Sequence, residues 1–155
     1  MATKDTTGVS GGSGSSLTSA SVTVGSNGNR ILDIAVVLGS NTATVSSVTR
    51  NGQSATQIQR VALVDTCIEV WRIIAPTTGA ATITASFSTS VGEAYVAWYS
   101  VYNVNQTTPS STTQTQSSGS WITNSVSITG GSTDDLGVAF FGWSTGGVDT
   151  ASFGG

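Results

Sequence analysis

The chain has 155 residues and a formal net charge of −3, and only 8% of its residues are charged, against about 25% in an average soluble domain. Its five basic residues are scattered (Lys4, Arg30, Arg50, Arg60 and Arg72), so they form no cluster that could neutralise a run of phosphates. Nucleic-acid binding is therefore not expected. Membrane insertion is not expected either, because no stretch approaches the roughly 18 consecutive apolar residues of a spanning helix.

The first segment, residues 1–16, reads MATKDTTGVSGGSGSS and has no apolar periodicity. Such a composition predicts a flexible Gly/Ser/Thr arm that orders only against a partner. It also lacks the apolar core of a secretory signal. Short segments of period two, separated by turn residues, begin at Leu17, and they predict a single β-sandwich domain over residues 17–155.

The predicted strands follow in order. Residues 19–24 alternate and end at a GSNGN turn, and residues 30–38 are apolar on nearly both faces, which is typical of a central strand. Residues 44–50 and 53–61 flank Asn51-Gly52, the strongest short signal for a β-hairpin, because both residues accept the positive φ of a type I′ turn. Residues 67–75 form a further strand that ends at Pro76, which cannot donate to a ladder.

A strand over residues 81–88 alternates apolar and hydroxyl side chains, so one face is core and the other solvent. The next strand, EAYVAWYSVYNV over residues 93–104, carries rings on both faces: Tyr95 and Tyr99 on one, Trp98 and Tyr102 on the other. A ligand platform would place its rings on one face, so these rings favour a core role. A polar loop over residues 105–120 precedes strands at 121–128 and 136–143, and the tail contains no clear strand.

Together these segments predict an all-β fold, an antiparallel β-sandwich that is immunoglobulin- or jelly-roll-like, with about eight or nine strands.

Catalytic chemistry has little support in this sequence. There is no histidine, which removes the usual general base and the commonest metal ligand, so no catalytic, cofactor-binding or metal-binding residue is assigned. A glycosidase would need two carboxylates facing one cleft, and the candidates are Asp33, Asp65, Glu69, Glu93, Asp134 and Asp135. Asp33 and Glu69 are expected on a solvent face or paired with an arginine such as Arg30 or Arg72. The single cysteine, Cys67, is expected to be a small buried hydrophobe.

Three segments together resemble a known module: NRILDIAVVL, then SSVTRNGQSAT with EVWRIIAPTTGAATITASFS, then AYVAWYSVYNVNQTTP. The succession covers residues 29–109. It resembles an all-β, immunoglobulin- or jelly-roll-like module of phage structural proteins and secreted bacterial multidomain proteins. The resemblance implies a non-catalytic role in assembly, decoration or adhesion, and it carries no catalytic residues to this chain.

The sequence therefore favours a structural or interaction module on the surface of a virus or phage particle, such as a capsid decoration or a tail or fibre protein. Its partners would be further copies of itself or other virion proteins. The alternative is a carbohydrate-binding or adhesion domain of a secreted bacterial protein, at the cell surface, whose exposed rings would stack on glycans. The candidate ligand or subunit contacts are Tyr102, Asn103, Trp121 and Trp143.

Overall fold

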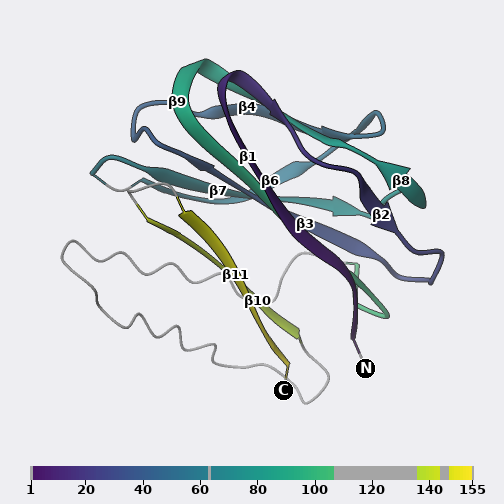
Figure 1. The fold of residues 1–155 in the computed structure, drawn as a ribbon. Helices are drawn as coiled ribbons and strands as arrows, with labels where there is room; N and C mark the ends of the chain where they lie inside the picture. The colour runs from purple at the N-terminus through teal and green to yellow at the C-terminus, as the bar shows by residue number, and fades with distance from the viewer. Residues whose placement is uncertain (1, 63, 107–135, 144–146, 155) are drawn as a thin grey trace.

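The computed structural model of the protein describes residues 2–62, 64–106, 136–143 and 147–154, the last two ranges by their backbone alone. Every regular element in these ranges is a strand, and every ladder is antiparallel (Figure 1). The eight longer strands are β1 (Thr3–Thr18), β3 (Ile31–Leu38), β4 (Val45–Arg50), β6 (Thr56–Ala62), β7 (Cys67–Ile74), β9 (Ile83–Tyr102), β10 (Leu136–Trp143) and β11 (Gly147–Gly154). The short strands are β2 (Val22–Val24), β5 (Gln53–Ser54) and β8 (Gly79–Ala81). The predicted antiparallel β-sandwich is confirmed.

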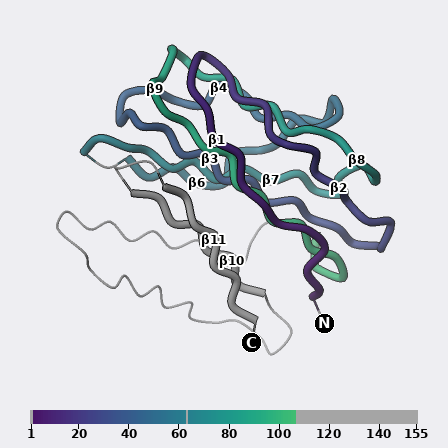
Figure 2. Tube along the Cα trace, in the orientation of Figure 1, coloured from purple at the N-terminus to yellow at the C-terminus, as the bar shows by residue number. Residues whose placement is uncertain are grey.

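A long two-stranded ribbon organises the molecule. β1 pairs with β9 along its whole length, and β2 pairs with β8 directly beyond that ladder. The ladder shifts register between Gly12 and Gly14 and again between Gly14 and Ser16. Extra residues in a ladder bend the strands and increase their twist, and Figure 2 shows β1 and β9 turning together at one end of the molecule. The two halves of the ribbon thereby enter different layers of the sandwich.

The two layers share β9. Its first part pairs with β4 and its last part with β3, both on the edge opposite β1, so the order of the main sheet is β5-β4-β9-β3-β7-β6. Side chains from both layers meet in one core, which includes Val45, Val48, Ile83, Ala85 and Phe87 from the first layer and Leu32, Ile34, Val36, Trp71 and Trp98 from the second. Every residue of β3 is buried, so its predicted central position is confirmed. The hairpin of β10 and β11 lies beside the sheet, where β11 approaches β9 (Figure 1).

Two buried charged side chains join the layers at either end of β4. Glu69 of β7, which is 1% exposed, accepts the Val45 N–H at 3.0 Å and the Gln57 side-chain amide at 2.8 Å. Arg50, which is fully buried, donates to the Val22 carbonyl at 2.9 Å and the Gly79 carbonyl at 2.6 Å. Burial lowers the pKa of Arg50. β4 is thus fixed across the core by hydrogen bonds as well as by packing.

Three expectations about elements are wrong. Residues 1–16 were expected to be a flexible coil, but Thr3–Thr18 form β1, because β9 offers them a free edge along its whole length. Residues 81–88 and 93–104 were expected to be separate strands, but Ile83–Tyr102 form one bent strand that passes through the polar residues 88–90 and Gly92. The tail was expected to lack a strand, but Gly147–Gly154 form β11 against β10.

The Asn-Gly hairpin is confirmed. β4 and β5 pair next to the turn, and Asn51 and Gly52 have φ values of 48° and 77°. A fourth expectation, a single strand over residues 53–61, is wrong, because Gln53–Ser54 pair with β4 whereas Thr56–Ala62 form β6 and pair with β7. The predicted strand over residues 136–143 is confirmed as β10. The polar loop from residue 107 on and the predicted strand over residues 121–128 lie outside the described residues.

Candidate assembly edge

The N-terminal part of β1 lies along the last half of β9. We call this segment, Thr3–Gly12, the arm. Its register places Gly8 opposite Trp98 and Gly11 opposite Tyr95, and successive residues point to opposite faces of the sheet. Two aromatic rings of β9, one on each face, therefore each lie beside a glycine of the arm.

The space beside these rings has no room for a side chain. A Cβ atom at Gly8 would lie 2.3 Å from Cζ2 of Trp98, and one at Gly11 would lie 2.7 Å from Cε1 of Tyr95. Real Cβ atoms do not approach ring carbons so closely. The arm can therefore lie against the two rings only because Gly8 and Gly11 have no side chains.

The arm is held chiefly by its backbone. None of its side chains is buried, whereas Leu17 and Ser19, beyond the bend, are 8% and 4% exposed. Side chains of the arm add polar contacts: Asp5 accepts the Gly25 N–H at 2.8 Å and the Ser100 hydroxyl of β9 at 3.2 Å, and Ser10 accepts the Ala20 N–H at 2.9 Å. Each such bond stabilises the folded state by about 1 kcal/mol. The arm is therefore ordered without contributing apolar side chains to the core.

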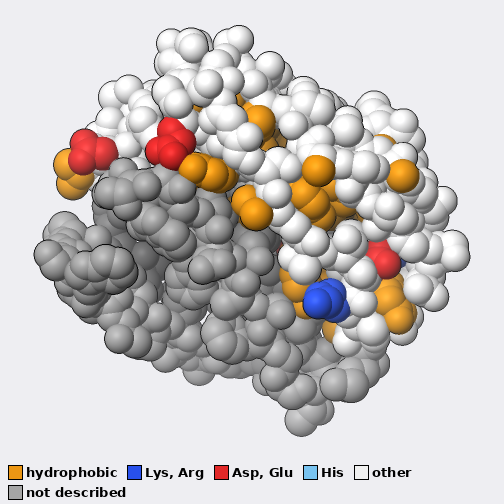
Figure 3. Space-filling view, viewed as in Figure 1, with side chains coloured by type: hydrophobic (Ala, Val, Ile, Leu, Met, Phe, Trp, Pro, Cys, Tyr) orange, Lys and Arg blue, Asp and Glu red, His pale blue; other side chains and the backbone are white. Residues whose placement is uncertain are grey.

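Residues 20–25 lie against the arm, where the Ala20 and Gly25 amides donate to Ser10 and Asp5, but they do not pair with it as a strand. No strand in the described part of the chain pairs with β1 other than β9, and Val9 is 51% exposed. The face that carries β1 shows mostly uncharged side chains and backbone (Figure 3). Unpaired strand edges with few charges are the usual template for pairing with another chain. Beneath the arm, the buried indole N–H of Trp98 has no acceptor among the described residues.

The aromatic rings of β9 are mostly buried and do not form an exposed platform for a ligand. Trp98 and Tyr99 are 5% and 4% exposed, and Tyr95 and Tyr102 are half-buried. Tyr95 donates its hydroxyl to Glu93 at 2.7 Å, and this bond raises the pKa of Tyr95. The expectation that the strand's rings serve the core is confirmed for Trp98 and Tyr99.

Of the four predicted contact residues, Tyr102 and Asn103 lie at the end of β9, beside the start of the arm. Tyr102 ends β9 opposite Thr3 of the arm. Asn103 is exposed and has a φ of 57°, and its N–H donates to the Gly28 carbonyl at 3.2 Å, so its backbone binds the loop before β3 while its side chain faces solvent. Trp121 lies outside the described residues. Trp143 ends β10 opposite Gly147, and its side chain is not among those described.

The sequence alone does not reveal the arm as a surface element. The sequence feature that marks the arm is the pair Gly8 and Gly11, which are three residues apart and so lie on opposite faces of a strand. That pattern becomes meaningful only beside the matching spacing of Tyr95 and Trp98, which also lie three residues apart and on opposite faces.

The carboxylates form structural pairs. Asp33 and Arg72 make a two-pronged ion pair, with oxygen–nitrogen distances of 2.7 and 2.8 Å, which raises the pKa of Arg72. Glu69 pairs with Arg60 at 3.3 Å. The expected pairing with arginine is confirmed for Asp33 with Arg72, whereas the partner of Glu69 is Arg60 and neither carboxylate is on a solvent face.

The two buried acids, Asp33 and Glu69, do not face one cleft. Asp33 lies opposite Arg72 and Glu69 lies opposite Val36 in the ladder of β3 with β7, so the two acids project from opposite faces of the sheet. Glu93 binds the Tyr95 hydroxyl, and Asp65 is exposed in the turn before β7. Asp134 and Asp135 lie outside the described residues. Asp33 and Glu69 therefore cannot serve together as the two carboxylates of one glycosidase cleft.

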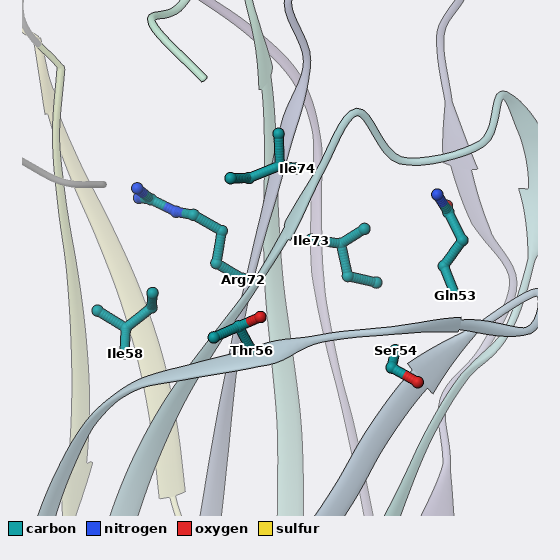
Figure 4. A pocket seen from close by; sticks show the side chains of 7 residues that line it. All are labelled: Gln53, Ser54, Thr56, Ile58, Arg72, Ile73 and Ile74. Carbon is teal, nitrogen blue, oxygen red and sulfur yellow. The ribbon is translucent and has the colours of Figure 1, made fainter. Parts of the chain in front are cut away.

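A shallow pocket of about 340 Å³ lies at the opposite side of the sheet from the arm, between β5, β6 and β7 (Figure 4). Its described lining consists of Gln53, Ser54, Thr56, Ile58, Arg72, Ile73 and Ile74. The guanidinium of Arg72 is already bound to Asp33. No aromatic ring is among these lining residues, so the pocket offers no surface on which a sugar could stack.

Among the described residues, no group of histidine, cysteine and acidic side chains is arranged to hold a metal ion, and no helix has the length and apolarity to cross a bilayer. Cys67 is buried as expected, and desolvation raises the pKa of its thiol. Comparisons of the chain with protein-family models, with curated proteins and with solved structures find no match. Function is therefore inferred from the arm, the β9 rings and the paired charges alone.

Proposed function

We propose that this protein is a non-catalytic structural module that assembles with neighbouring subunits through its arm and open strand edges. Its setting is the surface of a phage or virus particle, where it decorates the capsid or forms part of a tail or fibre. Its partners are further copies of this chain or other particle proteins.

One observation carries this proposal. The arm extends the sheet at an edge that no described strand covers, and it does so with hydroxyl and glycine residues around an exposed Val9. Natural proteins usually protect such an edge with lysine, proline or a covering loop. Apart from Lys4 near its start, the arm has neither lysine nor proline, and such an edge is suited to pairing with another chain, because main-chain hydrogen bonds then supply the affinity.

The proposal is tested by the mass of the full-length chain in sedimentation velocity, from micromolar to millimolar concentration. We expect the wild-type chain to form defined oligomers as its concentration rises. A variant with Thr7→Lys and Val9→Lys should remain monomeric to higher concentration, because charge on an edge strand opposes edge-to-edge pairing. Both residues are exposed, so the substitutions should leave the fold intact.

The matched control carries two lysines at Thr89 and Ser90, which are exposed on β9 near the bend of the ribbon. It has the same net charge as the edge variant and should associate like the wild type. A wild-type chain that stays monomeric throughout the range, or an edge variant that associates as the control does, would contradict the proposal.

A further inference from the structure

We propose that the arm is exchanged between copies of this chain: in the assembled protein, Thr3–Gly12 of one copy pairs with β9 of a neighbouring copy in the register it has with its own β9. This inference rests on the proposed function, because exchange requires a second copy. It goes further by naming the occupant of the β9 edge and the residues that select it.

The β9 edge is selective for this arm. Trp98 and Tyr95 fill the space where side chains of an added strand would lie, since Cβ atoms at the two facing positions would come within 2.3 and 2.7 Å of ring carbons. A strand that binds here needs glycine at two positions three residues apart, one on each face. Gly8 and Gly11 supply that pattern in every copy of the chain, so a second copy is the partner that fits.

The arm can leave its own β9 without withdrawing an apolar side chain of its own from the core. None of its side chains is buried. Asp5 and Ser10 accept hydrogen bonds from the backbone amides of Gly25 and Ala20. Asp5 also accepts the hydroxyl of the buried Ser100 at 3.2 Å, so release of the arm breaks one side-chain contact to β9 itself. The indole N–H of Trp98 has no described acceptor while the arm is in place, so release of the arm would let water reach an unsatisfied donor.

The segment after the arm has the features of a hinge. Register shifts flank Gly14, whose φ of 117° is open to glycine but strained for other residues. Beyond it the chain is anchored, because Leu17 is buried and Ser19 exchanges hydrogen bonds with Ile83 at 2.8 and 2.9 Å. The sequence SGSS over residues 13–16 is flexible when unpaired and spans about 13 Å when extended, so the exchange requires β9 of the adjacent copy to lie within that reach.

Disulfide trapping in the full-length chain tests this exchange. In a Cys67→Ala background, one variant carries Thr6→Cys with Ser100→Cys, and another carries Val9→Cys with Ala97→Cys. In each pair, the arm residue lies directly opposite the β9 residue in the ladder. Opposite residues in an antiparallel ladder alternate between wide and close spacing, and the two pairs are three positions apart, so one of them is closely spaced. The control carries Thr18→Cys with Thr84→Cys, whose hydroxyls lie 3.4 Å apart beyond the hinge.

Each variant is oxidised at a concentration where it sediments as an oligomer, then denatured without reduction and separated by size. We expect the two arm pairs to link different chains and the control pair to link residues of one chain. Arm pairs that close within single chains of an oligomer would overturn the exchange and leave the proposed assembly standing. A chain that is monomeric at every concentration would overturn both.

A second format keeps the test decisive if a double variant does not fold. Chains with Thr6→Cys alone and chains with Ser100→Cys alone, both in the Cys67→Ala background, are mixed before oxidation. Exchange predicts a disulfide that joins one chain of each kind. An assembled mixture that forms no such hybrid would contradict it.

Discussion

At the scale of single residues, the shape match between arm and β9 depends on two missing side chains. Gly8 and Gly11 lie directly beside Trp98 and Tyr95. In an ordinary strand, glycine is less favourable than alanine by about 0.5–1 kcal/mol. At these two positions glycine is the more favourable residue, because the methyl group of alanine would clash with a ring.

We therefore expect Gly8→Ala to lower the free energy of unfolding of the chain by about 1–3 kcal/mol, the usual cost of overpacking. The indole fluorescence should shift to longer wavelength as the arm moves off Trp98. The matched control is Gly28→Ala, where a Cβ would meet no atom within 4 Å and the change should stay within about 0.5 kcal/mol. Urea unfolding and emission spectra measure both, and equal effects at the two sites would contradict this account of the arm.

The thiol of Cys67 gives a second prediction at this scale. Burial raises its pKa, so at pH 8 less of it is thiolate than in a free cysteine, and its sulfur is fully shielded from reagents. Ellman's reagent should react slowly with the native chain and at once with the urea-unfolded chain. In a Cys67→Ala background, Val64→Cys places a thiol at a position that is 71% exposed, and this control should react rapidly in the native state.

At the scale of elements, β4 depends on polar contacts across the core at both of its ends. Arg50 holds the carbonyls of Val22, Thr77 and Gly79 at 2.6–2.9 Å, and Glu69 holds the amide of Val45. Buried backbone groups without partners are costly, so these two side chains join the short β2–β8 ladder and β7 to β4.

We expect Arg50→Met to lower the free energy of unfolding by about 2–4 kcal/mol, because methionine fills similar space but leaves three buried or half-buried carbonyls without a donor. The exposed cation of the arm supplies a control, and Lys4→Met should change stability by less than about 0.5 kcal/mol. Urea titration of both variants makes the comparison. An Arg50 variant as stable as the Lys4 variant would show that the layers are joined by packing alone.

Much of the element pattern could be predicted from the sequence. The full burial of β3, the Asn51-Gly52 turn and the alternation over residues 83–87 each follow from a local pattern. The arm could not be predicted in this way, because its order comes from β9, about ninety residues away in the chain. The continuity of β9 was hidden for a related reason, since Ser88, Thr89, Ser90 and Gly92 resemble a turn unless the bend of the paired ribbon is known.

The candidate site was only partly predictable for the same reason. Tyr102 and Asn103 were singled out at the end of an aromatic strand, and the structure places them beside the start of the arm. Gly8 and Gly11 carry no chemical signal of their own. They become functional candidates only through the rings they face, which is a property of the register and not of either segment alone.

At the scale of the whole molecule, the two layers enclose one main core, with a smaller buried cluster of Ile31, Tyr99 and Val101. The last half of β9 is paired with the arm, which adds no buried apolar side chain. The order of stability should follow this division. Segments that pack in the core open only with global unfolding, whereas an edge strand held by main-chain bonds opens locally.

Amide hydrogen exchange, followed by mass spectrometry in dilute and in concentrated protein, tests the central claim that the arm is the assembly element. We expect peptides from Thr3–Gly12 to exchange faster than those from β3 and β7 when the chain is dilute. On assembly, the arm should gain more protection than any other described segment. Assembly that leaves exchange in the arm unchanged while another surface gains protection would contradict the claim.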